Sequence, residues 1–469
     1  MQHFQKVIIF LLIFCSICFV SCRKDEKINT GPDVRLEFST DTVIFDTVFT
    51  SIGSITKKLM VYNTYKEKIN ISSIRLSGGT SSLYKINIDG SPASVLSNVE
   101  IEPHDSIFIF VRVTIDPNNQ NNPLVVSDSL IFETNGNIQK VNLVAWGQDA
   151  IFLNNHTIEQ PTVWTSEKPY VIYGSLEVDT SQTLTIQEGT RVYFHKGSYL
   201  VVDHDATLTV NGTLNSPVSF LGDRLDPDYK DVPGQWAGIW LAAGSKGHRF
   251  TYAIIRNANT GIEMDSAVST SQAALTLENT IIQNMLWNGI IAYDSYITAY
   301  NLVIANTGQS GLALFKGGNY SFRHMTIGNY WNWSVRTVPS LSISNYHYDN
   351  SGNKIPVDLT NAYFGNCIIY GNANEEIETD LIDGAAKNFR FDHCLLQTNL
   401  NTSDPLLFSE VIKNEDPLFY KPLEGKMQID TLSPAIDKGA DLGIANDIEG
   451  NVRTNAPDLG AYEFTPGGK

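Results

Sequence analysis

Four stretches of the sequence share one pattern: an apolar run, an asparagine, a brief turn and a second apolar run. They read YAIIRNANTGIEM, NTIIQNMLWNGII, NLVIANTGQSGLAL and HMTIGNYWNWSV. Their asparagines, spaced 27, 22 and 23 residues apart, are Asn257, Asn284, Asn306 and Asn329. Such a period is typical of solenoids, in which one unit cannot bury its apolar face alone and stacked strands about 4.8 Å apart build a continuous core. The sequence therefore predicts a solenoid over residues 151–402, followed by a last coil and a cap over 403–469.

The repeated asparagines have a structural explanation. At a turn between strands, asparagine tolerates a left-handed backbone, and its side chain can bond to the equivalent asparagine of the next coil. We therefore expect Asn257, Asn284, Asn306 and Asn329 to form a ladder. Two later units, NCIIYGN and DHCLLQTN, place Cys367 and Cys394 at one position, 27 residues apart. These cysteines should stack in the core; the alternative is a single disulfide between adjacent coils, which parallel in-register strands do not favour.

Residues 33–150 have the pattern of a β-sandwich. In DSIFIFVRVTID, alternate residues are apolar and fall on one face of a strand: Ile107, Ile109, Val111, Val113 and Ile115. Turn clusters such as SGGTSS and DGSP separate the runs at the spacing of a small sandwich. The arrangement resembles the immunoglobulin-like spacer modules of bacterial surface proteins, which implies that it holds the next domain away from a membrane.

The first 21 residues have the features of a signal peptide. The apolar run from Val7 to Val20 spans 14 residues, shorter than the roughly 20 that cross a bilayer, with Lys6 before it and Ser21 after it. VSC resembles the lipobox of bacterial lipoproteins, which implies that Cys22 is acylated and begins a linker over 22–32. RKDEK resembles the tag of surface-exposed lipoproteins of Bacteroidetes. These resemblances imply a lipid-anchored outer-membrane protein on the cell surface; the alternative is a plain secreted protein.

Charge limits the class of partner. The 469 residues carry a formal net charge of −17, which repels phosphate backbones, and no RNA-binding signature is present. We therefore expect no nucleic-acid partner, membrane contact only through the lipid anchor, and polysaccharide as the candidate ligand. The sequence carries no signal for an oligomeric state.

Further stretches give a specific resemblance to a fold. LTIQEGTRVYF, ATLTVNGT and YAIIRNANTGIEM look like the right-handed parallel β-helix repeat proteins found as lipoproteins in Bacteroidetes. The final DTLSPAIDKGADLGIANDIEGNVRTNAPDLGAYEF resembles the segment that closes many such β-helices. The resemblance implies an all-β chain in which a β-sandwich precedes a right-handed parallel β-helix. Because this scaffold carries many activities, function has to come from particular residues.

The closing segment has two interpretations. Its charges and glycines are expected to cover the open edge of the last coil, which would otherwise invite aggregation. The residues concerned are Asp447, Gly450, Arg453, Asp458, Gly460 and Glu463. The rival interpretation is a calcium site, since hard oxygen donors lie close together at Asp437, Asp441, Asp447 and Glu449, although without the order of an EF-hand. No other cofactor is indicated.

Candidate catalytic residues come from aligning the coils on Gly261, Gly289 and Gly311. This alignment brings four charged residues to neighbouring coils: Glu263, Asp265, Asp294 and Lys316. Pectate-lyase-like enzymes on this fold use carboxylates to hold calcium and a lysine or arginine as base. The alternative, which we favour, is a solvated edge with unrelated charges. The G-x-S-x-G, H-E-x-x-H and Walker signatures are missing.

Aromatic residues form the second candidate site. They lie in turns or strand ends: Trp287, Tyr330, Trp331 and Trp333, then Tyr346, His347 and Tyr348. Flat rings stack against sugar rings, so we expect the three tryptophans to form an exposed platform on one side of the solenoid. Trp236 and Trp240 are instead expected to seal the core.

Three functions are consistent with these features. The first, which we favour, is a surface-anchored module that binds or presents polysaccharide without catalysis. The second is a polysaccharide lyase or glycosidase that uses Glu263, Asp265, Asp294 and Lys316. The third is an adhesin-like stalk that binds another protein.

Overall fold

The computed structural model describes residues 27–49, 53–115, 124–266 and 272–466, and their regular structure is β-strand apart from three short 3-10 turns. The chain divides into two compact units between Gln148 and Asp149. The expected signal peptide and Cys22 lie outside the described residues. Within the described ranges, no helix is long and apolar enough to cross a membrane.

The N-terminal unit contains two five-stranded sheets. The first has the order β1 (Glu37–Phe38), β3 (Lys57–Tyr62), β8 (Ser106–Val113), β5 (Tyr84–Ile88) and β6 (Ser91–Pro92). The second has the order β2 (Thr42–Phe49), β10 (Asn137–Gln148), β9 (Leu124–Thr134), β4 (Ile69–Leu76) and β7 (Val95–Ile101). The pairs are antiparallel, except that β10 runs parallel to β2.

One apolar core joins the two sheets. Ile109 and Val111 of β8 are fully buried, and they share a cluster with Phe132 of β9 and Leu143 of β10. The alternation expected in residues 107–115 is confirmed, because every second side chain points into this core. The unit is therefore a β-sandwich, as its turn spacing predicted.

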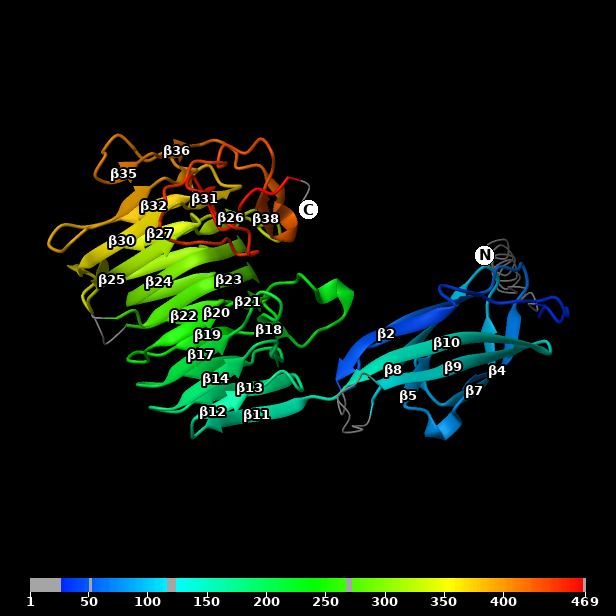
Figure 1. Cartoon of the computed structure of the whole chain (residues 1–469). Coiled ribbons are helices and arrows are strands. Elements are labelled where there is room, and N and C mark those ends of the chain that lie inside the picture. The colour runs from blue at the N-terminus through cyan, green and yellow to red at the C-terminus, as the bar shows by residue number, and fades with distance from the viewer. Residues whose placement is uncertain (1–26, 50–52, 116–123, 267–271, 467–469) are drawn as a thin grey trace, which may run out of the picture. The chain divides into compact units, whose positions relative to one another are not determined.

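The C-terminal unit is a parallel β-helix, which confirms the predicted fold class. Its 24 strands, from β11 (Ile151–Ile158) to β36 (Ile412–Lys413), pair in parallel with the strands one coil away. Figure 1 shows these coils stacked from green to orange. The register of pairing defines three long faces, which we name A, B and C in the order in which the chain visits them within one coil.

The strands distribute over the three faces as follows. Face A contains the end of β13 (Tyr170–Val178), β16 (Tyr199–Val202), β19 (Gly238–Leu241), β22 (Ile262–Met264), the starts of β24 (Ile290–Thr307) and β25 (Leu312–Arg323), β27 (Leu341–Ser344) and β32 (Ile377–Asp380). Face B contains β12 (Thr162–Trp164), β14 (Thr183–Gln187), β17 (Thr207–Asn211), β20 (His248–Thr251), the start of β23 (Leu275–Met285), the middle of β24, the end of β25, β30 (Leu359–Gly365), β33 (Arg390–Asp392) and β35 (Phe408–Ser409). Face C contains the start of β13, β15 (Arg191–Phe194), β18 (Val218–Gly222), β21 (Ala253–Arg256), the ends of β23 and β24, β26 (Thr326–Asn329), β31 (Ile368–Gly371), β34 (Leu395–Leu396) and β36.

Side chains that point inward from all three faces fill the coils. Ile282 and Ile304 of face C are fully buried in this core, together with Cys367 and Cys394. Both cysteines are free thiols, and the Cys367 backbone N–H lies 3.4 Å from the Cys394 sulfur. Burial holds the pKa of the Cys367 thiol well above its usual value. The cysteines thus stack in adjacent coils, as their spacing predicted.

The asparagine ladder expected at the corner between faces C and A is wrong in its bonding. Asn257, Asn284 and Asn306 do have left-handed φ angles of 64°, 60° and 54°. However, Asn257 donates to the Lys230 carbonyl, Asn284 to the Asp231 carboxylate and Asn306 to the Pro422 carbonyl. Asn329 instead donates to the Thr307 hydroxyl. Loops that reach this corner supply acceptors for three of the side chains, and Thr307 supplies the fourth, so the asparagines bond to these groups rather than to one another.

A direct asparagine pair exists at the corner between faces B and C. Asn301 Nδ2 donates to Asn279 Oδ1 of the preceding coil at 2.8 Å, and both residues have φ near 50°. The repeat pattern also aligns these two residues, five positions before Asn306 and Asn284, so the sequence contained the signal.

The C-terminal segment, residues 415–466, packs along face C. Its antiparallel pair β37 (Phe419–Lys421) and β38 (Lys426–Ile429) and the chain that follows place Met427, Ala461 and Tyr462 against Val303 and Ile368. Figure 1 shows this red segment beside β26 and β31. The expectation that its charged residues cover the edge of the last coil is therefore wrong. Val303, Ala305, Ile368 and Leu395 form an apolar outer face, and covering it decides where the segment lies.

A buried polar network fixes this segment. The Arg453 guanidinium is almost fully buried and forms an ion pair with Glu463. It also donates to Asn301 Oδ1 at 2.9 Å and to the Gly460 carbonyl at 3.1 Å. Thr326 of face C accepts the Ala461 N–H at 2.9 Å. The network therefore ties the segment to coils more than a hundred residues earlier in the chain.

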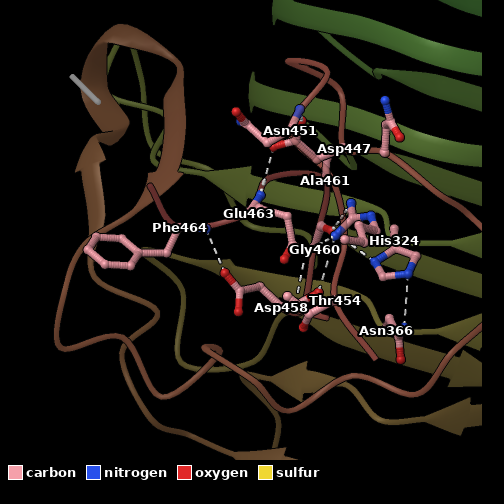
Figure 2. A network of polar contacts seen from close by, with 12 residues as sticks. His324, Asn366, Asp447, Asn451, Thr454, Asp458, Gly460, Ala461, Glu463 and Phe464 are labelled. Carbon is pink, nitrogen blue, oxygen red and sulfur yellow. Dashed lines mark hydrogen bonds and ion pairs between the residues drawn. The ribbon is translucent and has the colours of Figure 1, made fainter. Parts of the chain in front are cut away.

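Asp447 organises the turn before Arg453. Its carboxylate accepts the backbone N–H groups of Glu449, Asn451 and Glu463 and the Asn451 side-chain amide, at 2.7 to 3.0 Å. Figure 2 shows the bond from Glu463. Both oxygens are thus engaged by N–H donors, which does not match the calcium ligand considered from the sequence. Across the described ranges, no group of three or more His, Cys, Asp or Glu side chains is arranged to hold a metal ion.

Candidate functional site on face A

The outer surface of face A carries a row of side chains, one from each coil. Register places Trp240 beside Glu263, Glu263 beside Ile291, and Ile291 beside Ala313. Because alternate side chains of a strand point to opposite sides, Ile262 and Met264 are buried in the core while Glu263 points outward. Two residues further along each strand, the side chains point outward again, and this second row of side chains contains Asp265.

Trp240 and Asp265 are joined across neighbouring coils. The Trp240 side chain is 44% exposed, and its Nε1 donates to Asp265 Oδ2 at 3.0 Å. The expectation that Trp240 seals the core is wrong, because Ile239 and Leu241 on either side point inward. Trp236 does occupy the core, where it stacks on Phe194 with ring centroids 4.2 Å apart. Period-two alternation in GIWL would have assigned Trp240 correctly.

Glu263 and Asp265 form a pair of carboxylates on one strand face. Partial burial raises the pKa of Glu263, and the nearby Asp265 charge adds to the effect. Tyr293, on the next coil, also has a raised pKa, because it is partly buried and faces both carboxylates. The three side chains thus share one electrostatic environment, in which Glu263 keeps its proton to a higher pH than an exposed glutamate.

Asp294 and Lys316 lie at the end of face A, in left-handed conformations with φ of 42° and 61°. The register between β24 and β25 shifts at this point. Burial raises the pKa of Asp294, while the Lys316 charge opposes the shift. Lys316 Nζ lies 5.1 Å from the centre of the Tyr293 ring, a cation–π distance. The structure therefore groups the four charged candidates around Tyr293, a residue that the sequence analysis missed although it aligns with Asp265 when counted from Gly289 and Gly261.

The predicted tryptophan platform is wrong in its central member. Trp331 is only 3% exposed, and its Nε1 donates to the Ser334 hydroxyl at 2.9 Å. Tyr330 packs edge-on against Phe419 of the C-terminal segment. Trp287 and Trp333 are 48% and 56% exposed, in the turns that lead into the face A strands β24 and β27. Turn positions follow no period, so the sequence pattern could not separate the buried from the exposed rings.

A buried ion pair shapes the turn that carries Trp333. Arg336 and Glu376 lie 2.5 Å apart, with side chains 2% and 0% exposed. Glu376 also accepts the Ser340 hydroxyl at 2.6 Å, directly before β27. This pair fixes the base of the turn from which Trp333 projects.

A hairpin borders the other edge of face A. It consists of β28 (Tyr346–Tyr348) and β29 (Lys354–Pro356). Strand β28 lines a cavity of about 390 Å³, together with Lys316 and Asp380. Tyr346 donates to Asp380 at 2.5 Å, and Lys354 Nζ lies 3.8 Å from the centre of the Tyr346 ring. Tyr348 is 61% exposed. Face A therefore combines exposed rings with carboxylates from Trp240 as far as this hairpin.

Comparison with known proteins bears on the β-helix. Residues 156–248 match the model of a pectate-lyase-like β-helix domain. No curated protein matches the sequence. The chain is similar to the catalytic unit of a GH87 α-1,3-glucanase from Streptomyces thermodiastaticus, with 9% identity, 76% of this chain and 89% of that chain covered, and a TM-score of 0.30. It is also similar to pectate lyase Pel9A, with 13% identity, 68% and 88% covered, and a TM-score of 0.30. A third similarity is to a family 123 glycoside hydrolase from Clostridium perfringens, with 11% identity and a TM-score of 0.18. The chain spans about a quarter, 26%, of that protein, and the match covers 26% of this chain.

Proposed function

We propose that the protein binds an extracellular polysaccharide along face A and holds it without cleaving it. One observation carries the proposal: exposed Trp240 and half-buried Tyr293 flank Glu263 and Asp265 on three successive coils. A flat ring offers apolar contact to the C–H face of a sugar, and carboxylates accept hydrogen bonds from its hydroxyls. The match of residues 156–248 to a pectate-lyase-like domain also supports a carbohydrate ligand.

Charge favours a neutral polysaccharide over a uronate polymer. Glu263, Asp265 and Asp380 line face A, and Lys354 near its end is already paired with Asp380 at 3.0 Å. The chain as a whole carries a net charge of −17. A polyuronate would meet repulsion along this face, whereas neutral hydroxyls would gain charge-assisted hydrogen bonds.

Trp240→Ala is expected to weaken binding of the first neutral polysaccharide that the wild type retains by about five- to thirtyfold, because a stacked ring contributes roughly 1–2 kcal/mol. Affinity electrophoresis against a neutral β-glucan, a neutral α-glucan, a xylan and polygalacturonate would measure it. Phe110→Ala, which removes a ring of similar exposure in the N-terminal unit, 38% against 44%, is the control. Unchanged retention of Trp240→Ala beside a wild type that binds would rule out face A as the site.

Polysaccharide cleavage is the second candidate, favoured by the raised pKa of Glu263 beside Asp265. A carboxyl that keeps its proton can act as general acid while its ionised neighbour acts as base or nucleophile. Release of reducing ends or unsaturated uronides by the wild type, lost in Glu263→Gln with binding retained, would establish catalysis. Binding without product would support the non-catalytic proposal, and absence of all polysaccharide binding would favour the adhesin-like stalk.

We further propose that the mature protein is a lipoprotein on the outer surface of a Bacteroidetes cell, with the β-sandwich serving as an immunoglobulin-like spacer. Cys22→Ala should move it from the membrane fraction to the soluble fraction, because acyl chains would be its anchor. Fractionation with immunoblotting measures this, and protease added to intact cells tests surface exposure. Membrane retention of Cys22→Ala, or protection equal to that of a periplasmic control, would contradict the respective part of the proposal.

A further inference from the structure

A second cavity lies on face C, beside the C-terminal segment that packs on this face. Its volume is about 480 Å³, within the range of roughly 300–1,000 Å³ typical of ligand pockets. Ile254 of β21 and Ile281 of β23 lie in register on neighbouring coils and form an apolar floor. Residues 424–426, Gln428, Ile448 and Tyr462 of the C-terminal segment line one wall. The pocket thus lies between two parts of the chain that are distant in sequence.

The charges around this cavity balance. Lys230, Arg256 and Lys426 face Asp231, Glu424 and Glu449, three cations against three anions. Arg256 is paired with Asp231 at 2.5 Å, and Lys426 with Glu424 at 2.8 Å. A pocket with paired charges exerts no net attraction on an anion or a cation. It favours a neutral ligand that can both donate and accept hydrogen bonds.

Gln428 provides an independent sign of a ligand. Its Nε2 donates to Glu449 Oε1 at 2.6 Å, which fixes the orientation of the amide. Its Oε1 is buried and has no hydrogen-bond partner among the described residues. An unpaired buried acceptor is unfavourable, and a donor hydroxyl of a ligand would remove that cost. Two further amides that line the cavity, Asn279 and Gln283, could bond to other hydroxyls of the same ligand.

We propose that this cavity binds one or two sugar units of a neutral saccharide, as a site separate from face A. The apolar pair Ile254 and Ile281 would contact the C–H face of the ring, and a sugar hydroxyl would donate to Gln428 Oε1. Because the ligand would bridge face C and the C-terminal segment, binding also stabilises the attachment of that segment. The inference stands independently of the function proposed for face A.

Titration calorimetry and thermal unfolding of the mature protein test this proposal with four probes. Cellobiose and maltose are the neutral probes; glucuronate and glucosamine are the charged comparators. We expect a neutral disaccharide to bind and to raise the melting temperature, and both charged sugars to bind at least tenfold more weakly. Failure of both disaccharides to bind, or equal binding of a charged sugar, overturns the proposal.

Three variants test whether the disaccharide binds in this cavity or on face A. Gln428→Leu removes the acceptor while keeping a similar volume, and should weaken disaccharide binding by about tenfold or more. Gln187→Leu, an exposed glutamine of β14 that does not line the cavity, should bind like the wild type. Trp240→Ala should also leave disaccharide binding unchanged. Disaccharide binding that is lost with Trp240→Ala and kept with Gln428→Leu would assign the sugar to face A and overturn the proposal, while leaving the function of face A supported.

Discussion

Arg453→Met is expected to destabilise the C-terminal unit by about 3–5 kcal/mol at neutral pH, as is usual when one partner of a buried ion pair is removed. Methionine fills much of the same volume, so lost packing contributes little. The loss instead arises because Glu463 and Asp458 stay in the interior without their cation, and because Asn301 Oδ1 and the Gly460 carbonyl lose a donor. Urea unfolding measures the change, and limited proteolysis reports release of the C-terminal segment.

The penalty of Arg453→Met should depend on pH with a definite sign. Burial raises the folded-state pKa values of Asp458 and Glu463, and the Arg453 charge opposes both shifts. Without Arg453 these folded-state pKa values rise further, so the folded variant binds more protons than the unfolded chain between the ordinary carboxyl pKa, about 4, and the raised value. The stability lost through the two carboxylates is therefore largest above the raised values. It shrinks as the pH falls to about 4, where both groups are protonated in the folded variant.

Lys387→Met is the matched control. Lys387 forms an ion pair with Asp383 at 2.7 Å, but the two side chains are 41% and 97% exposed. Exposed pairs contribute about 0–1 kcal/mol, so this variant should unfold close to the wild type. Equal small losses for both variants, or a loss in Arg453→Met that does not change with pH, would show that the buried charges do not hold the segment.

The parts of the fold that repeat could be predicted from the sequence. The 22- to 27-residue period fixes a stack of short strands, because only neighbouring units can bury each other's apolar faces. Alternation likewise assigned Ile109 and Val111 to the core of the sandwich. The same rule, applied to GIWL, points Trp240 outward, and applied from Gly289 it points Tyr293 outward. The candidate site on face A was thus partly present in the pattern.

The parts that do not repeat could not be predicted in this way. Trp331 and Trp333 are two residues apart in one turn, and only the path of that turn, fixed by Arg336 and Glu376, buries one ring and exposes the other. The C-terminal segment depends on long-range contacts, such as Arg453 with Asn301, 152 residues earlier. No local period encodes such a contact. From the sequence alone, the charged residues of the C-terminal segment fitted a cap as well as a calcium loop, because their hydrogen-bond partners could not be read from it.

The two isoleucines at 281 and 282 give the sharpest test of the coil register. Ile282 is fully buried among the inward side chains, whereas Ile281 is half-buried at the floor of the cavity on face C. Ile282→Asp would place an unpaired charge in the core, at a cost of several kcal/mol, and should abolish folding of the C-terminal unit. Ile281→Asp should fold, because its carboxylate can reach solvent through the cavity. Circular dichroism and thermal unfolding of the purified variants measure both.

The next coil should respond differently, because the C-terminal segment covers it. Val303 and Ile304 are both fully buried, Ile304 inside the coils and Val303 outside them, against Met427, Ala461 and other apolar residues of the segment. Ile304→Asp should therefore abolish folding, as Ile282→Asp does. Val303→Asp should leave the coils wound but detach the segment, which proteolysis would detect as cleavage after residue 415 with the remaining β-helix intact. Val303→Asp could instead keep full stability and a segment that resists proteolysis, like Ile281→Asp. That result would show that the apolar contact with face C does not position the C-terminal segment.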